Sequence, residues 1–408
     1  MPRSTIDDRH LPRRAFSGPT PAVVALVAGV MVGISLDALG EWFPSSLPAY
    51  TDWALDYPSP SWLLWWVLGD TTEATLYKSA PGGLLMIAGA AFAHYGSPRR
   101  RGFPLACATD LWPWVAISAG LALLASNLAW GWTLTSSGLW QPTFAPFVSV
   151  PPAVVVMYGR GWAVAATGAA LGVLLVTPLS LLMVNEVSTP LDLSPIAGSV
   201  TGMCLGGALA FTLCRHLPWL ASPAAGPRVP PPETSAAGTE ETDTVRPRAQ
   251  QSTWVVRRVL ADFTEAHFYG NEWAGAGLLL GTIAAFAVNP AAVSYGSGLF
   301  PELLAAQLLA GACGVVLWRR RWARYGMYPT FVPIVSVTPA TVLTYGGSPA
   351  SILAGAALGA AIAPPLADAA ARRLPAHIQP MVAYTATMAV CTVSIVPILG
   401  LLPGFRTV

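Results

Sequence analysis

Long apolar stretches separated by short polar segments dominate this chain of 408 residues. Each stretch has roughly 17 to 25 residues, the length that a helix needs to cross a lipid bilayer. The pattern therefore predicts an all-α integral membrane protein with about eleven transmembrane helices. The expected spans are 20–40, 79–96, 111–132, 141–158, 162–184, 194–214, 273–290, 300–318, 328–345, 349–367 and 378–400.

The chain also contains an internal repeat. The pattern Pro-Thr-Phe-x-Pro-x-Val-Ser-Val-x-Pro-Ala occurs at 142–153 and again at 329–340, an offset of 329 − 142 = 187. Upstream, Asp-x-x-Glu-Ala-x-x-Tyr occurs at 70–77 and at 262–269, an offset of 262 − 70 = 192. So many matches at nearly one spacing indicate two copies of one structural unit.

The repeat predicts a domain organisation. A tail at 1–19 and an extra membrane helix at 20–40 precede repeat 1 at 62–214, which has five spans. A linker at 215–253, rich in Pro, Ala, Thr, Glu and Ser, is expected to be a disordered cytoplasmic tether. Repeat 2 follows at 254–400, with five more spans. Because the first unit enters the bilayer from outside and the second from inside, we expect an inverted repeat.

The arginines agree with this topology. Arginine-rich segments such as 99–101, 319–321 and 372–373 fall on the side that we assign to the cytoplasm, whereas Arg406 at the C-terminus falls on the opposite side. The outer segments 41–61, 133–140, 185–193, 291–299 and 346–348 carry neither Lys nor Arg. Positive residues concentrate in cytoplasmic loops. We therefore expect a bacterial plasma (inner) membrane protein with its N-terminus in the cytoplasm and its C-terminus outside. The net charge of +2 reflects topology, and we expect no nucleic-acid partner.

The proline segments are the strongest candidates for a substrate site. Several prolines in one apolar stretch break the helical hydrogen-bond ladder, and irregular backbone at membrane depth survives only inside protein or beside a cavity. Freed backbone groups and nearby hydroxyls can bind a solute there. Packing of a kinked helix, with the hydroxyls satisfying the freed backbone, is the alternative. The candidate substrate-binding residues are Thr143, Pro146, Ser149, Pro152, Thr330, Pro333, Ser336 and Pro339.

Two carboxylate pairs precede the first span of each unit, Asp70 with Glu73 and Asp262 with Glu265. An Asp followed three residues later by Glu fits a capping box at a helix N-terminus. The same pairs fit gating or ion coupling, and the sequence leaves both interpretations open. We place no charged residue at mid-depth of a span, which argues against a buried carboxylate relay and favours a neutral solute or an anion.

The sequence lacks the motifs of several common enzyme and cofactor sites. The chain has no Gly-rich nucleotide loop and no His-Glu-x-x-His motif, its five cysteines are scattered, and we expect no cofactor and no metal. An enzyme acting on lipid would need clustered ionisable residues, and the nearest cluster is Asp262, Glu265, His267 and Glu272. We expect the protein not to be an enzyme.

Two resemblances add to this interpretation. A pair of inverted five-helix units with one extra span resembles the plan of the ammonium and urea channel families, although the histidine pair of ammonium channels is missing from the spans. The stretch Asn289-Pro290 to Tyr295-Gly296, followed by Pro301, resembles tandem-repeat bacterial multipass membrane proteins whose function is uncharacterised. The second resemblance implies membership of that family and no substrate.

We conclude from the sequence that the chain is a transporter of a small neutral or anionic solute, with its site between the two proline segments. A passive small-solute channel is the alternative, and a lipid-modifying enzyme is the third interpretation. The expected partners are the lipid bilayer, the solute and a second copy of the chain in a homo-oligomer.

Overall fold

The described structure is built from helices. The computed structural model describes residues 47–57, 59–96, 102–103, 111–134, 140–220 and 252–407, and no strand is found among them. The expected extra span at 20–40 and most of the expected linker at 215–253 lie outside these residues. The all-α prediction is confirmed, and six helices are long and apolar enough to cross a membrane.

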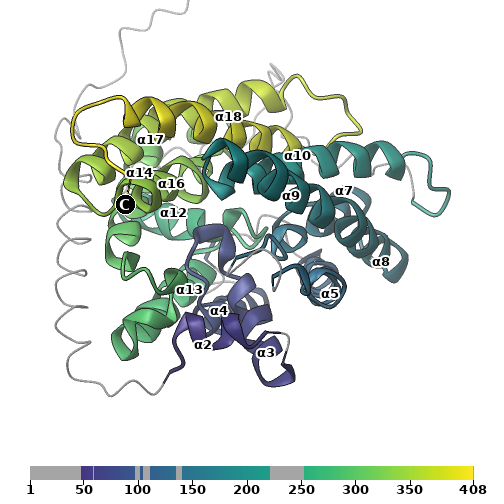
Figure 1. The fold of residues 1–408 in the computed structure, drawn as a ribbon. Helices are drawn as coiled ribbons and strands as arrows, with labels where there is room; N and C mark the ends of the chain where they lie inside the picture. Colours follow the sequence, from purple (N-terminus) through teal and green to yellow (C-terminus); the bar gives the residue numbers. More distant parts are fainter. Residues whose placement is uncertain are drawn as a thin grey trace, which may run out of the picture.

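The first half of the chain runs through α2 and α3, a sharp connection, and then α4 to α10 (Figure 1). Its helices are α2 (Tyr50–Leu55), α3 (Pro60–Asp70), α4 (Ala80–Tyr95), α5 (Trp112–Trp130), α7 (Val150–Tyr158), α8 (Trp162–Leu171), α9 (Thr177–Met183) and α10 (Pro195–Cys214). Short 3₁₀ turns join them at η2 (Glu73–Thr75), η4 (Ala145–Val148) and η7 (Thr189–Leu191), and π-helical turns flank α9 at η5 (Gly172–Val176) and η6 (Val184–Ser188).

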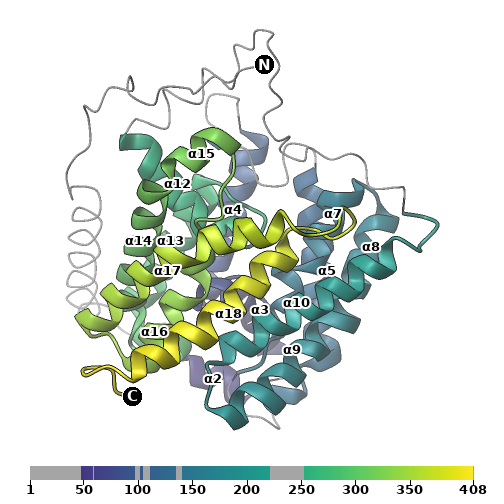
Figure 2. The same cartoon turned by 90° about the horizontal axis from the view of Figure 1, so that it is seen from above.

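The second half follows a similar order. Its helices are α12 (Ser252–Glu265), α13 (Glu272–Val288), α14 (Phe300–Leu317), α15 (Arg319–Tyr325), α16 (Val337–Tyr345), α17 (Pro349–Ala371) and α18 (Met381–Gly400). Its 3₁₀ turns are η8 (Pro290–Ala292), η9 (Ser294–Gly296) and η10 (Val332–Val335). Figure 2 shows α10 and α18 packed side by side, and they join the two halves on that face.

The six candidate spans are 112–130, 162–191, 195–214, 300–317, 349–371 and 381–400. The other expected spans within the described residues form shorter helices. Those at 79–96 and 273–290 become α4 and α13, and those at 141–158 and 328–345 contain a break. The predicted count of eleven is therefore met in part.

The break comes from proline. In each broken segment a 3₁₀ turn (η4 or η10) is followed by one serine, and an α-helix (α7 or α16) begins immediately after that serine. Ser149 has φ −136° and ψ −112°, and Ser336 has φ −141° and ψ −99°, so neither is helical. Each turn-plus-helix segment is about 21 Å long at 1.5 Å per residue, short of a hydrocarbon layer of about 30 Å.

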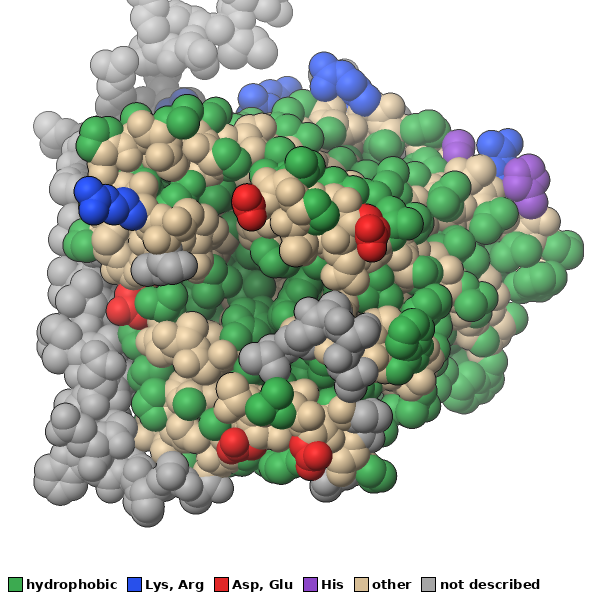
Figure 3. Space-filling model, in the orientation of Figure 1, with side chains coloured by type: hydrophobic (Ala, Val, Ile, Leu, Met, Phe, Trp, Pro, Cys, Tyr) green, Lys and Arg blue, Asp and Glu red, His purple; other side chains and the backbone are tan. Residues whose placement is uncertain are grey.

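The outer surface is suited to lipid. The face in Figure 3 is mostly hydrophobic, with a few scattered charged side chains. Large apolar side chains such as Leu64, Leu128, Leu174 and Leu280 are more than 60% exposed. Water would penalise such exposure, whereas a hydrocarbon solvent would not. The surface therefore fits a membrane-embedded protein.

Helices α4 and α13 make a close and reciprocal contact. A Cβ added to Gly89 would lie 2.3 Å from the carbonyl oxygen of Trp273, and one added to Gly281 would lie 2.5 Å from that of Pro81. The pairs are related by the repeat, because 281 − 89 = 192 and 273 − 81 = 192. Only glycine permits backbones to approach this closely. The two helices are therefore antiparallel, and each uses the same surface toward the other.

Gly277 tests this contact because its added Cβ would lie 2.1 Å from the carbonyl oxygen of Leu85. We expect Gly277→Ala to lower the free energy of unfolding by about 1–3 kcal/mol, the usual cost of overpacking. The matched control is Gly120→Ala in α5, where the added Cβ meets nothing within 4 Å. The control should unfold at the same or a slightly higher temperature in detergent. Equal melting temperatures for Gly277→Ala and wild type would contradict the packing argument.

Candidate functional site

The strongest candidate site is a pair of buried ionic clusters, one in each half. The first cluster consists of Asp70, Glu73 and Lys78, and all three side chains are 0% exposed. The second consists of Arg258, Asp262 and Glu265, and its side chains are at most 8% exposed. Ionised groups away from water are stable only when they are paired and hydrogen-bonded.

The chain makes a tight turn to form the first cluster. Helix α3 ends at Asp70, and the hydroxyls of Thr71 and Thr72 bond back to the carbonyls of Leu68 and Gly69. Lys78 then has φ +46°, in the left-handed region that side chains other than glycine seldom adopt. The turn brings the ammonium of Lys78 onto the carboxylate of Asp70 and over the Trp66 ring, 3.7 Å from its centre.

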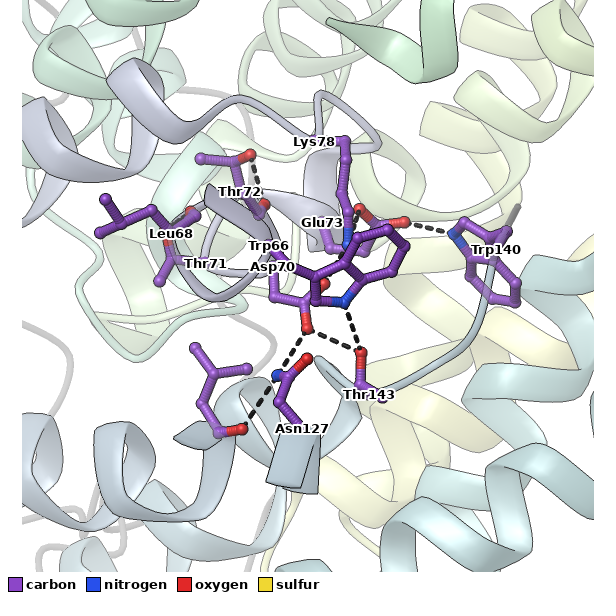
Figure 4. Close-up of polar contacts among 12 residues, drawn as sticks. Trp66, Leu68, Asp70, Thr71, Thr72, Glu73, Lys78, Asn127, Trp140 and Thr143 are labelled. Atoms are coloured by element: carbon purple, nitrogen blue, oxygen red, sulfur yellow. Dashed lines mark hydrogen bonds and ion pairs between the residues drawn. The ribbon is translucent and has the colours of Figure 1, made fainter. Parts of the chain in front are cut away.

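Asp70 links this turn to the proline break of the first half (Figure 4). Its Oδ2 accepts a hydrogen bond from the hydroxyl of Thr143 at 2.7 Å and another from Nδ2 of Asn127 at 3.0 Å. The Thr143 hydroxyl in turn accepts one from Nε1 of Trp66 at 3.2 Å. Lys78, Asn127 and Thr143 thus surround Asp70 with donors, and both of its carboxylate oxygens are hydrogen-bonded.

Glu73 has a different environment. Its Oε1 accepts from the indole N–H of Trp140 and from the hydroxyl of Tyr295, the latter at 2.6 Å. Its Oε2 lies 3.8 Å from Nζ of Lys78 and has no hydrogen-bond partner in the described part of the chain. Tyr295 belongs to η9 in the second half, so Glu73 connects the two halves.

The second cluster repeats the arrangement. The hydroxyl of Thr330 donates to Oδ2 of Asp262 at 2.7 Å and accepts from Nε1 of Trp322 at 3.1 Å. Arg258 binds Oδ1 of Asp262 through Nε at 3.1 Å and Oε2 of Glu265 through a terminal nitrogen at 2.6 Å. Its guanidinium lies 4.6 Å from the centre of the Trp322 ring.

The two clusters have the same parts at different positions in the repeat. By the offset of 192, Trp66 corresponds to Arg258 and Lys78 corresponds to Gly270. A Cβ at Gly270 would lie 1.9 Å from Oε2 of Glu265, so a lysine there would have to displace that carboxylate. The cation and the indole of the second cluster thus occupy repeat positions that differ from those of the first. The hydrogen bonds from indole to threonine and from threonine to aspartate are nevertheless the same in both clusters. Asn127 has no counterpart, because the matching stretch of α14 is Gly314-Val315.

The structure joins residues that the sequence analysis kept apart. Thr143 and Thr330 are candidates for substrate binding, whereas Asp70 and Asp262 are candidates for gating or capping. Each threonine donates to one of these aspartates. The four candidate prolines, Pro146, Pro152, Pro333 and Pro339, lie buried in η4, α7, η10 and α16.

The candidate serines are occupied within their own turns. The hydroxyl of Ser149 donates to the carbonyl of Ala145, and that of Ser336 donates to the carbonyl of Val332, both at 2.6 Å. Serine and threonine hydroxyls within helical turns can bond to carbonyls four residues earlier. These two contacts fit the packing alternative for the serines.

The capping interpretation of the carboxylate pairs is wrong. Asp70 is the last residue of α3 and Glu265 is the last of α12, so neither pair opens a long helix. Ser79 caps α4 by accepting from the N–H of Gly82, and Asn271 caps α13 by accepting from that of Trp273. The carboxylates instead neutralise buried cations.

Four members of the clusters are not predicted from the sequence: Trp66, Lys78, Arg258 and Trp322. Trp66 fits an aromatic belt at the membrane surface by its sequence, yet it is 1% exposed. One signal was available for Lys78, because it is the only lysine in the chain and lies at the edge of an apolar stretch. Nothing in the sequence ties Trp322 to Thr330.

The residues considered for a lipid-modifying enzyme do not converge on one reactive group. Asp262 and Glu265 bind Arg258, whereas Glu272 binds Arg257 and the backbone N–H of Phe103. His267 is 0% exposed, and neither ring nitrogen has hydrogen-bond geometry with a described residue. Burial lowers the pKa of His267 to about 4, and the backbone of Thr71 acts in the opposite direction.

No protein-family model and no curated protein matches the chain. The described residues fit a membrane-embedded helical protein, and they form paired ionic clusters beside two proline breaks.

Lys78 tests the ionic pairing. Lys78→Met leaves Asp70 and Glu73 buried without a cation, and we expect a loss of about 3–5 kcal/mol in the free energy of unfolding. The matched control is Arg372→Met, because Arg372 pairs with Asp368 and their side chains are 49% and 19% exposed. An exposed pair contributes about 0–1 kcal/mol. Unfolding in detergent measures both, and similar losses for the two variants would contradict the importance of burial.

His267 predicts a pH dependence. Its pKa is 6.5 when unperturbed and about 4 in the folded protein, so the unfolded chain binds more protons between these values. Folding stability should therefore fall as the pH is lowered from 6.5 toward 4. We expect His267→Gln to flatten the dependence of the melting temperature on pH in this window. The exposed imidazole of His216 provides the control, His216→Gln, which should leave the slope as in wild type.

Proposed function

We propose that this protein transports a small neutral solute across a membrane through a site between its two proline breaks. The observation that carries the proposal is the link from a buried carboxylate to each break, Asp70 to Thr143 and Asp262 to Thr330. Buried ionisable residues are expensive in a membrane protein and usually mark a transport path. Broken helices beside them supply polar backbone.

The proposed architecture is an inverted repeat of two five-helix units. The reciprocal contact of α4 with α13 supports it, because counterparts that pack antiparallel on equivalent surfaces require a two-fold relation. The pairing of α10 with α18, another pair of counterparts, supports it too. Eleven spans, a bacterial plasma membrane, a cytoplasmic N-terminus and an external C-terminus belong to the same proposal, as does the likeness to the ammonium and urea channel plan.

The polar groups of the proposed site are backbone carbonyls that proline leaves without their helical partner. Pro152 and Pro339 lack the N–H that would bond to the carbonyls of Val148 and Val335 in a regular helix. Such carbonyls can accept hydrogen bonds from a neutral solute with N–H or O–H groups. An anion fits less well, since each cluster contains two carboxylates and one cation.

The two halves differ in a way that suits alternating access. Gln307 of α14 donates to the carbonyls of Thr75 and Ile334, and accepts from the hydroxyl of Tyr77. Aligning Trp318 with Trp130, an offset of 318 − 130 = 188, places Ala119 opposite Gln307 in the first half. The side-chain amide of Gln307 therefore links the second break to the first half through hydrogen bonds, and the first break has no such amide. Exchange of these two arrangements would move the site between the membrane faces.

A thermal-stability screen in detergent tests the proposal. The panel contains polyols, sugars, amides, amino acids, carboxylates and common ions, and each compound is tested at several concentrations. A ligand at a hundred times its Kd should stabilise wild type by about 2.7 kcal/mol. We expect a neutral compound to stabilise wild type, and carboxylates not to.

Paired variants locate the site. Thr143→Val with Thr330→Val removes both hydroxyls, and Thr143→Ser with Thr330→Ser retains them. We expect the ligand-induced stabilisation to be lost in the valine variant and kept in the serine variant, each compared with its own melting temperature without ligand. Counterflow of the labelled ligand in proteoliposomes then separates a carrier, which shows exchange, from a passive channel, which does not. Absence of any stabilising compound would count against a solute site in the breaks.

A further inference from the structure

Glu73 is the unusual carboxylate of the two clusters. Of the four carboxylates in them, it alone has a buried oxygen, Oε2, without a hydrogen-bond partner among the described residues. An unpaired oxygen on an ionised and fully buried carboxylate is costly. A proton on Oε2 removes the charge, while Oε1 continues to accept from Trp140 and Tyr295.

The charges around Glu73 also favour a proton on its carboxylate. Asp70 has the closer contact with Lys78 and two further donors, so Lys78 and Asp70 neutralise each other. Glu73 then adds one uncompensated negative charge at 0% exposure. One bound proton makes the first cluster neutral. In the second cluster, by contrast, Arg258 contacts both carboxylates within 3.1 Å.

We propose that Glu73 binds one exchangeable proton at Oε2 and that this proton is the coupling ion of the transporter. The role in coupling rests on the proposed function, whereas proton binding does not. The proton comes from bulk water and returns to it, and no other bond is made or broken.

Titratable groups surround Glu73 on several sides. Lys78 and Asp70 face it from its own turn, Tyr295 faces it from η9, and Tyr50 of α2 lies against Tyr295 with the ring centres 5.7 Å apart. Burial raises the pKa of Glu73, Lys78 lowers it by a smaller amount, and Asp70 raises it. The balance favours the protonated carboxyl.

Protonation of Glu73 changes a contact between the two halves. An ionised carboxylate accepts a strong hydrogen bond from Tyr295, and a neutral carboxyl oxygen accepts a weaker one. Tyr295 lies next to Ser294, whose N–H donates to the carbonyl of Tyr77 at 2.7 Å. The proton on Glu73 thus weakens one of the links that hold the second half against the first, which is the kind of coupling that a two-state transporter needs.

Infrared difference spectroscopy during a pH titration tests proton binding without any solute. A buried protonated carboxyl gives a C=O band that shifts in heavy water. We expect this band in wild type, its loss in Glu73→Gln, and its retention in Glu265→Gln. Glu265 is the matched control because it is the repeat counterpart of Glu73 and binds Arg258 at 2.6 Å.

Asp262 is the rival proton site, because burial raises its pKa to about 6 against the effect of Arg258. The titration therefore includes Asp262→Asn. A band that survives Glu73→Gln and disappears in Asp262→Asn would overturn the assignment, as would a folded protein that shows no such band at any pH.

Tyr295→Phe keeps the proposal testable even if Glu73→Gln does not fold. Loss of the hydroxyl removes a donor that favours the ionised carboxylate, so the carboxyl band should persist to a higher pH than in wild type. Titration of the band at an unchanged pH in Tyr295→Phe would contradict the assignment to Glu73.

Coupling is tested separately with a ligand from the stability screen. If proton and solute are coupled, the Kd of the solute must change with pH in wild type, and this change must disappear in Glu73→Gln. A carboxyl band on Glu73 with a Kd that is independent of pH would retain the proton site and reject its coupling role. A Kd that depends on sodium concentration at constant pH would assign coupling to a cation instead.

Discussion

The pairing of buried charge is the constraint on which the rest of this structure depends. Asp70 and Asp262 would each be unstable inside an apolar protein without Lys78 or Arg258 beside them. Because Thr143 and Thr330 also bind these aspartates, the same pairing fixes where each proline break lies. Neither break can move away without losing its hydrogen bond to a paired aspartate, so the irregular backbone and the buried charge are linked.

The close contact of α4 and α13 determines where the two ionic clusters lie relative to each other. Each ionic cluster lies just before the N-terminus of one of these helices, and the helices are antiparallel. The clusters therefore lie toward opposite ends of the pair. Tyr295 bonded to Glu73, and Gln307 bonded to Thr75, are the polar links across this arrangement. The bond between Tyr295 and Glu73 therefore makes a buried carboxylate part of the contact between the halves.

The sequence predicted some of the site but separated its parts. Prolines and threonines of the breaks were identified because a repeated run of prolines must interrupt a helix at membrane depth, where irregular backbone is rare. The carboxylate pairs were also identified, yet their spacing of three residues imitates a capping box, and capping proved wrong. Glycines that close the contact of α4 with α13 had no signal of their own, because close approach is visible only once both helices are placed.

The sequence by itself determined the class of protein, the helical architecture and the repeated proline and carboxylate motifs, because apolar length and internal similarity are local properties of the chain. Only the tertiary structure decided which cation neutralises which carboxylate. Lys78 and Arg258 occupy non-equivalent positions in the repeat, and Trp66 and Trp322 do so as well. Their roles match because folding places each of them beside the carboxylate of its own cluster, and the requirement to neutralise a buried charge is satisfied by proximity, whatever the position in the sequence.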